Sequence, residues 1–206
     1  FPFGFYNSKL GMIIPTDYIC MVNKKSDILE AALQLLAVNG VHATPMSAIA
    51  KAGHTGMGTI YNLFATKEIL INAIYVEIKR REEVLLLVPH RKRTIKSQFE
   101  HFYLLITNFY LKNPACYKFM NQLHASPIIT DESRQEGRRA VRPVIEVIEA
   151  GQKEGILKNI DREELLLFIA GAISSHLDSL INPDLKVVEK PSFKNQLRLV
   201  WDAIKK

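Results

Sequence analysis

The chain has 206 residues and a mass of 23.4 kDa, which allows one large domain or two small ones. Hydrophobic residues make up 48% and charged residues 23%, a balance that excludes a disordered chain. The longest apolar stretch, residues 165–173, falls short of the ~20 residues that a membrane-spanning helix needs, so we expect a cytoplasmic protein with no membrane segment. The formal net charge of +6 favours an anionic partner, with nucleic acid the first candidate.

The two cysteines, Cys20 and Cys116, lie in unrelated contexts, without a CxxC pair or a Cys/His cluster at zinc-ligand spacing. We therefore expect reduced thiols and no bound metal. Residues 1–20 hold two prolines and neither helical nor strand periodicity, and Met21 has the character of a natural start. The segment lacks the charged and apolar regions of a signal peptide, so we predict an extension outside the fold.

The first helical signals lie between residues 28 and 44. Apolar residues recur with helical spacing over 28–36, and Gly40 stands where a C-terminal cap belongs. Thr44 and Pro45 then predict a new helix start. The threonine hydroxyl can cap the helix, and proline suits the first helical position because no N–H is needed there.

Two short helices are predicted next, over residues 46–53 and 57–64, and the turn 54–56 separates them. A longer helix capped by Thr66 follows to about residue 87, and the rest of the chain has helical patterns. We expect breaks at Asn113–Pro114, Ser126–Pro127, Gly155, Asn182–Pro183 and Pro191. Because no segment alternates with period 2, the prediction is an all-α protein of about nine helices.

Charged and catalytic residue types show no enzyme-like arrangement. Seven Lys and Arg residues gather over 79–96 beside Glu82 and Glu83, a run that by itself indicates a solvated helix end and loop. The six histidines include no HExxH motif and no pair at i, i+4, and no nucleophile constellation stands out. The glycines over 53–58 follow a helix, whereas a nucleotide-binding fingerprint follows a strand. We expect no enzyme and no cofactor.

The three short N-terminal helices have the pattern of a helix-turn-helix, whose second helix lies in the major groove of DNA. Matching residues at consistent spacing are Ile28–Ala32, Asn39–Gly40, Ala43–Thr44, Ile49–Ala50, Gly58–Tyr61, Phe64 and Lys67–Glu68. Over residues 28–77 the sequence thereby resembles the TetR family of bacterial transcriptional regulators, and residues 151–157 match it in outline. The resemblance implies a DNA-binding domain over 21–66 and an effector-binding and dimerisation domain over 67–206.

The resemblance and the side-chain chemistry together predict a DNA interface. Its expected members are Thr44, Ser47, Gly56, Met57, Gly58, Thr59, Tyr61, Asn62 and Lys67. The glycines permit close approach to a phosphate, and the hydroxyls and the lysine suit backbone contacts. Asn62 can pair with adenine, whereas Met57 and the Thr59 methyl can touch a thymine methyl.

Two positions depart from the family pattern. The family usually has Ala-Gly at the turn, where this chain has Gly53 and His54, so we expect His54 to adopt a positive φ. We interpret it as an exposed turn residue rather than a proton sensor. Met57 stands where many relatives have Lys or Arg, so we expect a less charged operator contact.

The larger region carries an aromatic stripe over residues 95–120. For most of its residues, plain core packing is the simplest interpretation. The family resemblance implies a ligand pocket in this bundle, and such pockets combine aromatic walls with a few polar groups. The candidate ligand residues, for a small apolar or aromatic effector, are Phe102, Tyr103, Ile106, Tyr110, Tyr117, Met120, Asn121 and His124.

Two C-terminal helices are candidates for a subunit interface. The segment 165–181 is apolar nearly all round, with small residues that allow close helix approach, and residues 197–204 form an apolar stripe. In the family, the final two helices of each subunit form a four-helix dimer interface. The predicted interface residues are Gly171, Ser174, Ser175, Leu197, Val200, Trp201 and Ile204. His176 and Asp178 are either a polar pair within it or its solvated edge.

These observations predict a homodimeric, ligand-responsive transcriptional regulator, a repressor that binds a palindromic operator in double-stranded DNA. An effector in the C-terminal region would favour the dimer state whose recognition helices do not fit successive major grooves. The alternative is a helical small-molecule sensor or carrier that has lost DNA binding. This alternative is suggested by Met57, which stands where many relatives have a Lys or Arg.

Overall fold

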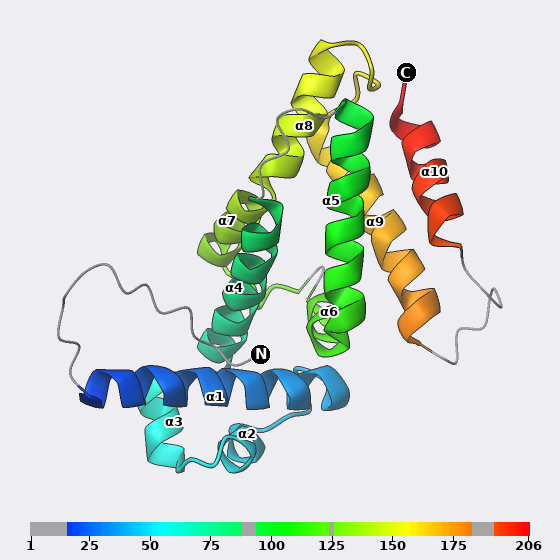
Figure 1. The fold of residues 1–206 in the computed structure, drawn as a ribbon. Helices are drawn as coiled ribbons and strands as arrows, with labels where there is room; N and C mark the ends of the chain where they lie inside the picture. The colour runs from blue at the N-terminus through cyan, green and yellow to red at the C-terminus, as the bar shows by residue number, and fades with distance from the viewer. Residues whose placement is uncertain (1–15, 88–93, 124–125, 183–191) are drawn as a thin grey trace. The chain divides into compact units, whose positions relative to one another are not determined.

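The computed structural model describes residues 16–87, 94–123, 126–182 and 192–206, with side chains from residue 24 onward. Within these ranges it has ten helices (Figure 1). They are α1 (Thr16–Asn39), α2 (Met46–Ala52), α3 (Met57–Leu63), α4 (Lys67–Leu86), α5 (Ile95–Lys112), α6 (Pro114–Gln122), α7 (Asp131–Ala140), α8 (Arg142–Lys153), α9 (Arg162–Ile181) and α10 (Phe193–Ile204). The one other regular pairing in the described residues is an isolated bridge between Leu157 and Lys205. The all-α prediction is confirmed.

The helix boundaries differ from the prediction in two places. The helical stretch before Gly155 divides at Val141 into α7 and α8, because Pro143 lies at the start of α8, where a missing N–H is tolerated. Helix α1 begins at Thr16, ahead of the expected boundary at residue 21. We expected residues 1–20 to lie outside the fold, and residues 1–15 of this segment are outside the described residues.

The chain separates into two compact units, and the division is not the one expected at residue 66. Unit 1 runs to Ile74 and also contains residues 118–129, whereas unit 2 contains residues 75–117 and 130–206. The Gln122 side chain explains the extra segment of unit 1. It accepts a hydrogen bond from Val41 N at 2.9 Å and donates one to Leu36 O at 3.1 Å.

The turn between α2 and α3 depends on His54, which has φ +48°. The expected positive φ is confirmed, and among the described residues His54 is the only non-glycine with one. Histidine tolerates this region better than branched residues do. Gly40 ends α1 with φ +90°, as its predicted capping role requires.

The predicted start of α2 is wrong in one detail. Thr44 does not cap the helix; Pro45 occupies the N-cap position and makes no side-chain hydrogen bond. The Thr44 hydroxyl donates instead to Gly40 O at 2.8 Å, and the residue is 1% exposed. Thr66 does cap α4, because its hydroxyl accepts from Ile69 N at 3.2 Å.

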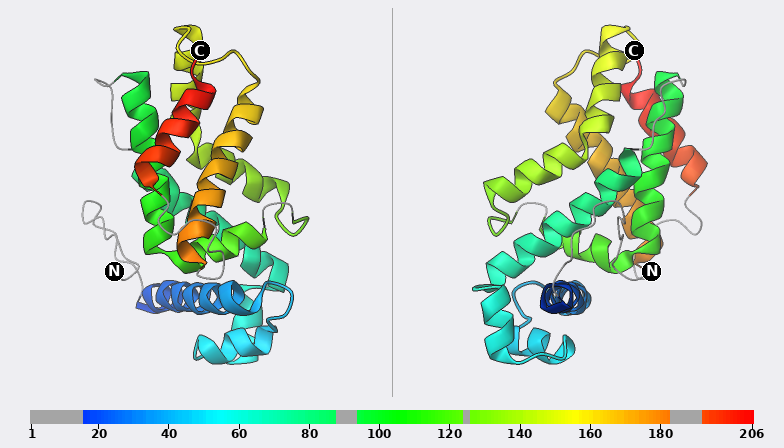
Figure 2. Two further views of the ribbon diagram at one scale, coloured as in Figure 1. Left: turned by 90° about the vertical axis from the view of Figure 1, so that its right-hand side faces the viewer. Right: turned by 60° about the vertical axis from the view of Figure 1, so that its left-hand side comes forward.

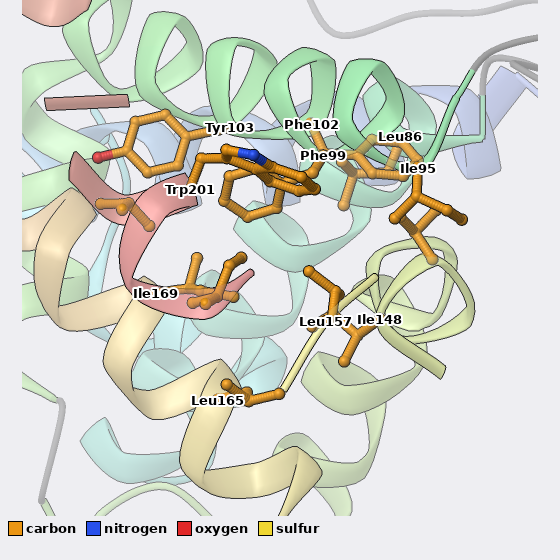
Figure 3. Packing of buried hydrophobic residues seen from close by; sticks show 13 residues of the cluster. Leu86, Ile95, Phe99, Phe102, Tyr103, Ile148, Leu157, Leu165, Ile169 and Trp201 are labelled. Atoms are coloured by element: carbon orange, nitrogen blue, oxygen red, sulfur yellow. The ribbon is translucent and has the colours of Figure 1, made fainter. Parts of the chain in front are cut away.

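Unit 2 is organised around α5, which packs against α8, α9 and α10 (Figure 2). Their buried apolar side chains form one cluster, which includes Phe99, Phe102, Ile148, Leu165 and Trp201 (Figure 3). The rings of Phe99 and Trp201 lie 5.6 Å apart, centroid to centroid. Aromatic pairs at such distances add stability beyond the area that they bury.

Helix α9 is long and apolar enough by composition to cross a membrane. In this fold it packs on α5, α8 and α10, through buried residues that include Leu165, Ile169 and Leu177. Its other side leaves Leu167 62% and Phe168 48% exposed. One face of α9 therefore belongs to the core of unit 2, and the opposite face is an apolar surface that no other described part of the chain covers.

Candidate functional site

Helix α3 presents one open face. Met57, Gly58, Tyr61 and Asn62 are exposed, and they share a side of the helix because they lie at i, i+1, i+4 and i+5. Ile60 is fully buried and anchors the opposite side. A Cβ added at Gly58 would meet nothing within 4 Å, so the space beside this glycine is open among the described residues.

The residues expected to flank this face have different environments. Ser47 is exposed near the start of α2, Thr59 is half-buried, and Gly56 has open space around it. Thr44 is buried, and its hydroxyl donates to Gly40 O rather than pointing to the surface where a DNA phosphate was expected. The Lys67 ammonium donates to His42 O at 3.0 Å, which ties the start of α4 to the turn after α1.

The candidate ligand residues do not form one group. Phe102, Tyr103 and Ile106 belong to, or pack against, the apolar cluster of α5 and α8–α10. Met120 and the exposed Asn121 belong to unit 1. His124 lies outside the described residues.

Tyr110 and Tyr117 have polar partners inside unit 2. The Tyr110 hydroxyl donates to Glu82, and the Tyr117 hydroxyl donates to Asp178 at 2.8 Å. The Tyr117 oxygen also lies 2.8 Å from Ser174 O, which brings α6 beside α9. Burial raises the pKa of both phenols, so both are neutral donors at pH 7.

A buried charge cluster on α4 was missed by the sequence analysis. Glu82 is 1% exposed and accepts from the Lys79 ammonium at 2.9 Å and from Tyr110. Burial by itself would lower the pKa of Lys79, but the adjacent carboxylate outweighs burial and raises it. The interpretation of this run as a solvated helix end is wrong for Glu82. The available signal was the i, i+3 spacing of opposite charges.

Two buried polar atoms near α10 have no hydrogen-bond partner in the described structure, Tyr103 Oη and His176 Nε2. Both rings contact Phe193, with centroid distances of 5.8 and 5.6 Å. Burial raises the pKa of Tyr103 to about 12, against the opposing influence of Gln196, and burial lowers the pKa of His176. His176 is therefore a neutral core residue at pH 7, which differs from both predicted roles at an interface.

The lowered pKa of His176 predicts a pH dependence of folding. The unfolded chain takes up a proton near pH 6.5 and the folded chain only at lower pH, so stability is full above that pH and falls as pH drops below it. One group contributes a slope of at most about 1.4 kcal/mol per pH unit. Denaturant unfolding at pH 7 and pH 5 should show a larger loss for the wild type than for His176→Gln. Equal losses would contradict this assignment.

The expected dimer residues divide between core and surface. Val200, Trp201 and Ile204 are at most 6% exposed within their own chain, so they have almost no surface to offer a second subunit. Their apolar stripe packs into the core of unit 2 in this single chain. Gly171 and Ser175 are exposed, and Ser174 and Leu197 are half-buried.

In the residues that the structure describes, no group of three or more His, Cys, Asp or Glu could hold a metal ion. A helix-turn-helix with an open second helix, followed by a separate helical bundle, defines a DNA-binding transcriptional regulator. A family model described as "Bacterial regulatory proteins, tetR family" matches residues 28–74. A second, described as "Tetracyclin repressor-like, C-terminal domain", matches residues 94–205. The chain belongs to the TetR family.

Individual relatives agree with this assignment. The chain is 28% identical over 150 residues to the uncharacterized HTH-type transcriptional regulator YhgD of Bacillus subtilis, covering 69% of this chain and 76% of YhgD. It is 34% identical over 92 residues to the fatty acid metabolism regulator protein of Bacillus subtilis, a match that covers 40% of this chain and 45% of that protein. The crystal structure of a TetR family transcription regulator from Marinobacter aquaeolei VT8 has the same fold, with a TM-score of 0.76 and 18% sequence identity. The match covers 89% of this chain and 96% of that one.

Proposed function

We propose that this protein is a homodimeric repressor that binds a palindromic operator through α3 and releases it when a small apolar effector binds unit 2. The open face of α3 carries the proposal. Met57 is 39% and Tyr61 47% exposed, although the same helix buries Ile60 completely. Large side chains held outward on a short, well-anchored helix are what major-groove contact requires.

The exposed face of α9 supports the homodimer. Leu167, Phe168, Gly171 and Ser175 are exposed along one side of the helix, and Leu199 of the adjacent α10 is 61% exposed. Large apolar side chains and a glycine allow two copies of such a face to pack closely about a two-fold axis. A two-fold dimer presents two α3 helices, which is why the operator should be palindromic.

Gly171→Glu should dissociate this dimer without unfolding the chain. A Cβ at Gly171 meets nothing within 4 Å in the single chain, so the folded subunit tolerates a side chain there. At a two-fold interface the new carboxylate would be desolvated close to its symmetry mate. Sedimentation equilibrium should give a dimer for the wild type and a monomer of unchanged helicity for the variant.

Gln135→Glu is the matched control, because it adds the same carboxylate at an exposed position of α7. It should sediment as the wild type does. If Gly171→Glu also sediments as a dimer, the proposed interface is wrong.

The effector part of the proposal rests on the aromatic content of unit 2 and on the relative whose name refers to fatty acid metabolism. An apolar chain or flat aromatic molecule is the class that such walls accept. To move the operator-binding equilibrium from 99:1 to 1:99, an effector must favour the released state about 10⁴-fold. Since coupling is reciprocal, the operator must weaken effector binding equally.

Duplex-DNA binding tests the function directly. A fluorescent random-sequence duplex should bind with an affinity that falls steeply with salt, and sequences selected from a duplex library should be palindromic. Adding long-chain fatty acids or flat aromatic compounds should release the selected duplex. Effector binding without any salt-dependent DNA binding would identify the alternative, a sensor or carrier.

A further inference from the structure

The DNA-binding unit has an unusual distribution of charge. The first arginine of the chain is Arg80, which lies beyond unit 1, and residues 118–129 of that unit contain no arginine either. Arginine, with its two parallel donors, makes the commonest specific contact to guanine. Unit 1 therefore has no guanidinium with which to read a G·C pair.

No lysine takes the place of an arginine on α3, because this helix contains no cationic residue. Lys51 is exposed at the end of α2, and Lys67 is bonded to His42 O at the start of α4. Lys25 on α1 lies over the Phe64 ring, 5.7 Å from its centroid. These lysines lie on α1, α2 and α4 rather than on α3, so we expect them to contact DNA phosphates rather than base edges.

The side chains that α3 does expose favour adenine and thymine. Asn62 is exposed and makes no hydrogen bond among the residues that the structure describes, so its amide can pair with N6 and N7 of adenine. Met57 offers an apolar thioether, whose partner in the major groove is the C5 methyl of thymine. Neither group is an Arg or Lys side chain, which makes the commonest specific contact to guanine.

We infer that the base pairs facing α3 are A·T pairs, read by Asn62 through adenine and by Met57 through the thymine methyl, while affinity comes from lysines on the flanking helices. This inference rests on the proposed function, since it specifies which DNA the same surface binds. It also separates two roles: the α3 side chains discriminate between sequences, and Lys51 strengthens binding to all of them.

Modified DNA tests the inference without altering the protein. In the duplex selected by the wild type, each thymine is replaced in turn by uracil, which lacks the C5 methyl group. Each adenine is likewise replaced by 7-deazaadenine, which lacks N7. At one or more thymine positions in each half-site, this replacement should lower the protein's affinity for the duplex about fourfold, the ratio expected for one buried methyl group. At one or more adenine positions, the replacement should lower the affinity about fivefold or more.

Variants assign each effect to its side chain. Met57→Ala should bind thymine and uracil duplexes equally, and Asn62→Ala should bind adenine and 7-deazaadenine duplexes equally. Lys51→Ala is the matched control: it should reduce the salt slope by about 1 and keep the full sensitivity to both modified bases. Because all three side chains are exposed, none of these changes removes core packing.

Each outcome bears on a different statement. Guanine-rich selected half-sites, or equal binding of every uracil duplex by the wild type, would overturn the inference and leave the proposed function intact. Selection of no sequence, together with no salt-dependent binding, would overturn the proposed function itself. Base sensitivities that persist in Met57→Ala and Asn62→Ala would also overturn the assignment to these residues.

Discussion

Lys79→Met is expected to destabilise the protein by about 3–5 kcal/mol at pH 7, the cost of removing one member of a buried ion pair. Glu82 is 1% exposed, so after the change its carboxylate would stay buried, with the Tyr110 hydroxyl as its remaining partner in the described structure. Urea unfolding followed by circular dichroism measures the loss.

Two further variants show whether the unpaired charge is the cause. Lys79→Met combined with Glu82→Gln should recover much of the stability, because an amide carries no charge and still accepts from Tyr110. Arg142→Met removes an ion pair to Glu146 in which both side chains are more than 60% exposed, and it should cost less than about 1 kcal/mol. If Lys79→Met costs no more than Arg142→Met, the pair does not offset the burial of Glu82.

Trp201→Ala is expected to cost about 3–5 kcal/mol within a single chain, since it leaves a cavity in the core of unit 2. The indole is 6% exposed, lies beside Phe99 and belongs to the cluster of α5 and α8–α10 (Figure 3). The loss should appear in urea unfolding and should not depend on protein concentration beyond the dependence of the wild type.

Val84→Ala is the control for this prediction. Val84 is an apolar residue of the same unit, 68% exposed on α4, and its truncation should change stability by no more than about 0.5 kcal/mol. A Trp201→Ala protein that unfolds like the wild type but sediments as a monomer would contradict the core assignment. It would restore Trp201 to the subunit interface.

The N-terminal unit was predictable because its signals are local. Gly40 as a C-cap, Thr66 as an N-cap and the positive φ of His54 each depend on a few neighbouring residues, and all three are confirmed. The exposed and buried sides of α3 likewise follow from helical spacing around Ile60. The TetR family could be identified from this segment because its apolar, glycine and aromatic positions match the family at fixed spacing, although the turn residues Gly53 and His54 do not.

Other features required the tertiary structure, because periodicity indicates that a face is apolar but not what covers it. The stripe of Val200, Trp201 and Ile204 would suit a partner subunit as well as its own core, and only the packing of α10 on α5 and α9 distinguishes the two. Gln122 joins unit 1 through bonds to residues more than 80 positions away, and no local pattern can contain that information.

Polar groups show the same limit most clearly. A threonine before a proline is a helix cap by local rules, yet the Thr44 hydroxyl donates to Gly40 O because burial makes any unpaired hydroxyl costly. Glu82 has the composition of a surface residue, and it is stable in the interior only because Lys79 and the distant Tyr110 meet it there. The sequence by itself determined the helices, the turn and the family. Which polar and apolar faces meet was decided by the tertiary structure, because the free energy of a buried group depends on partners that are remote along the chain.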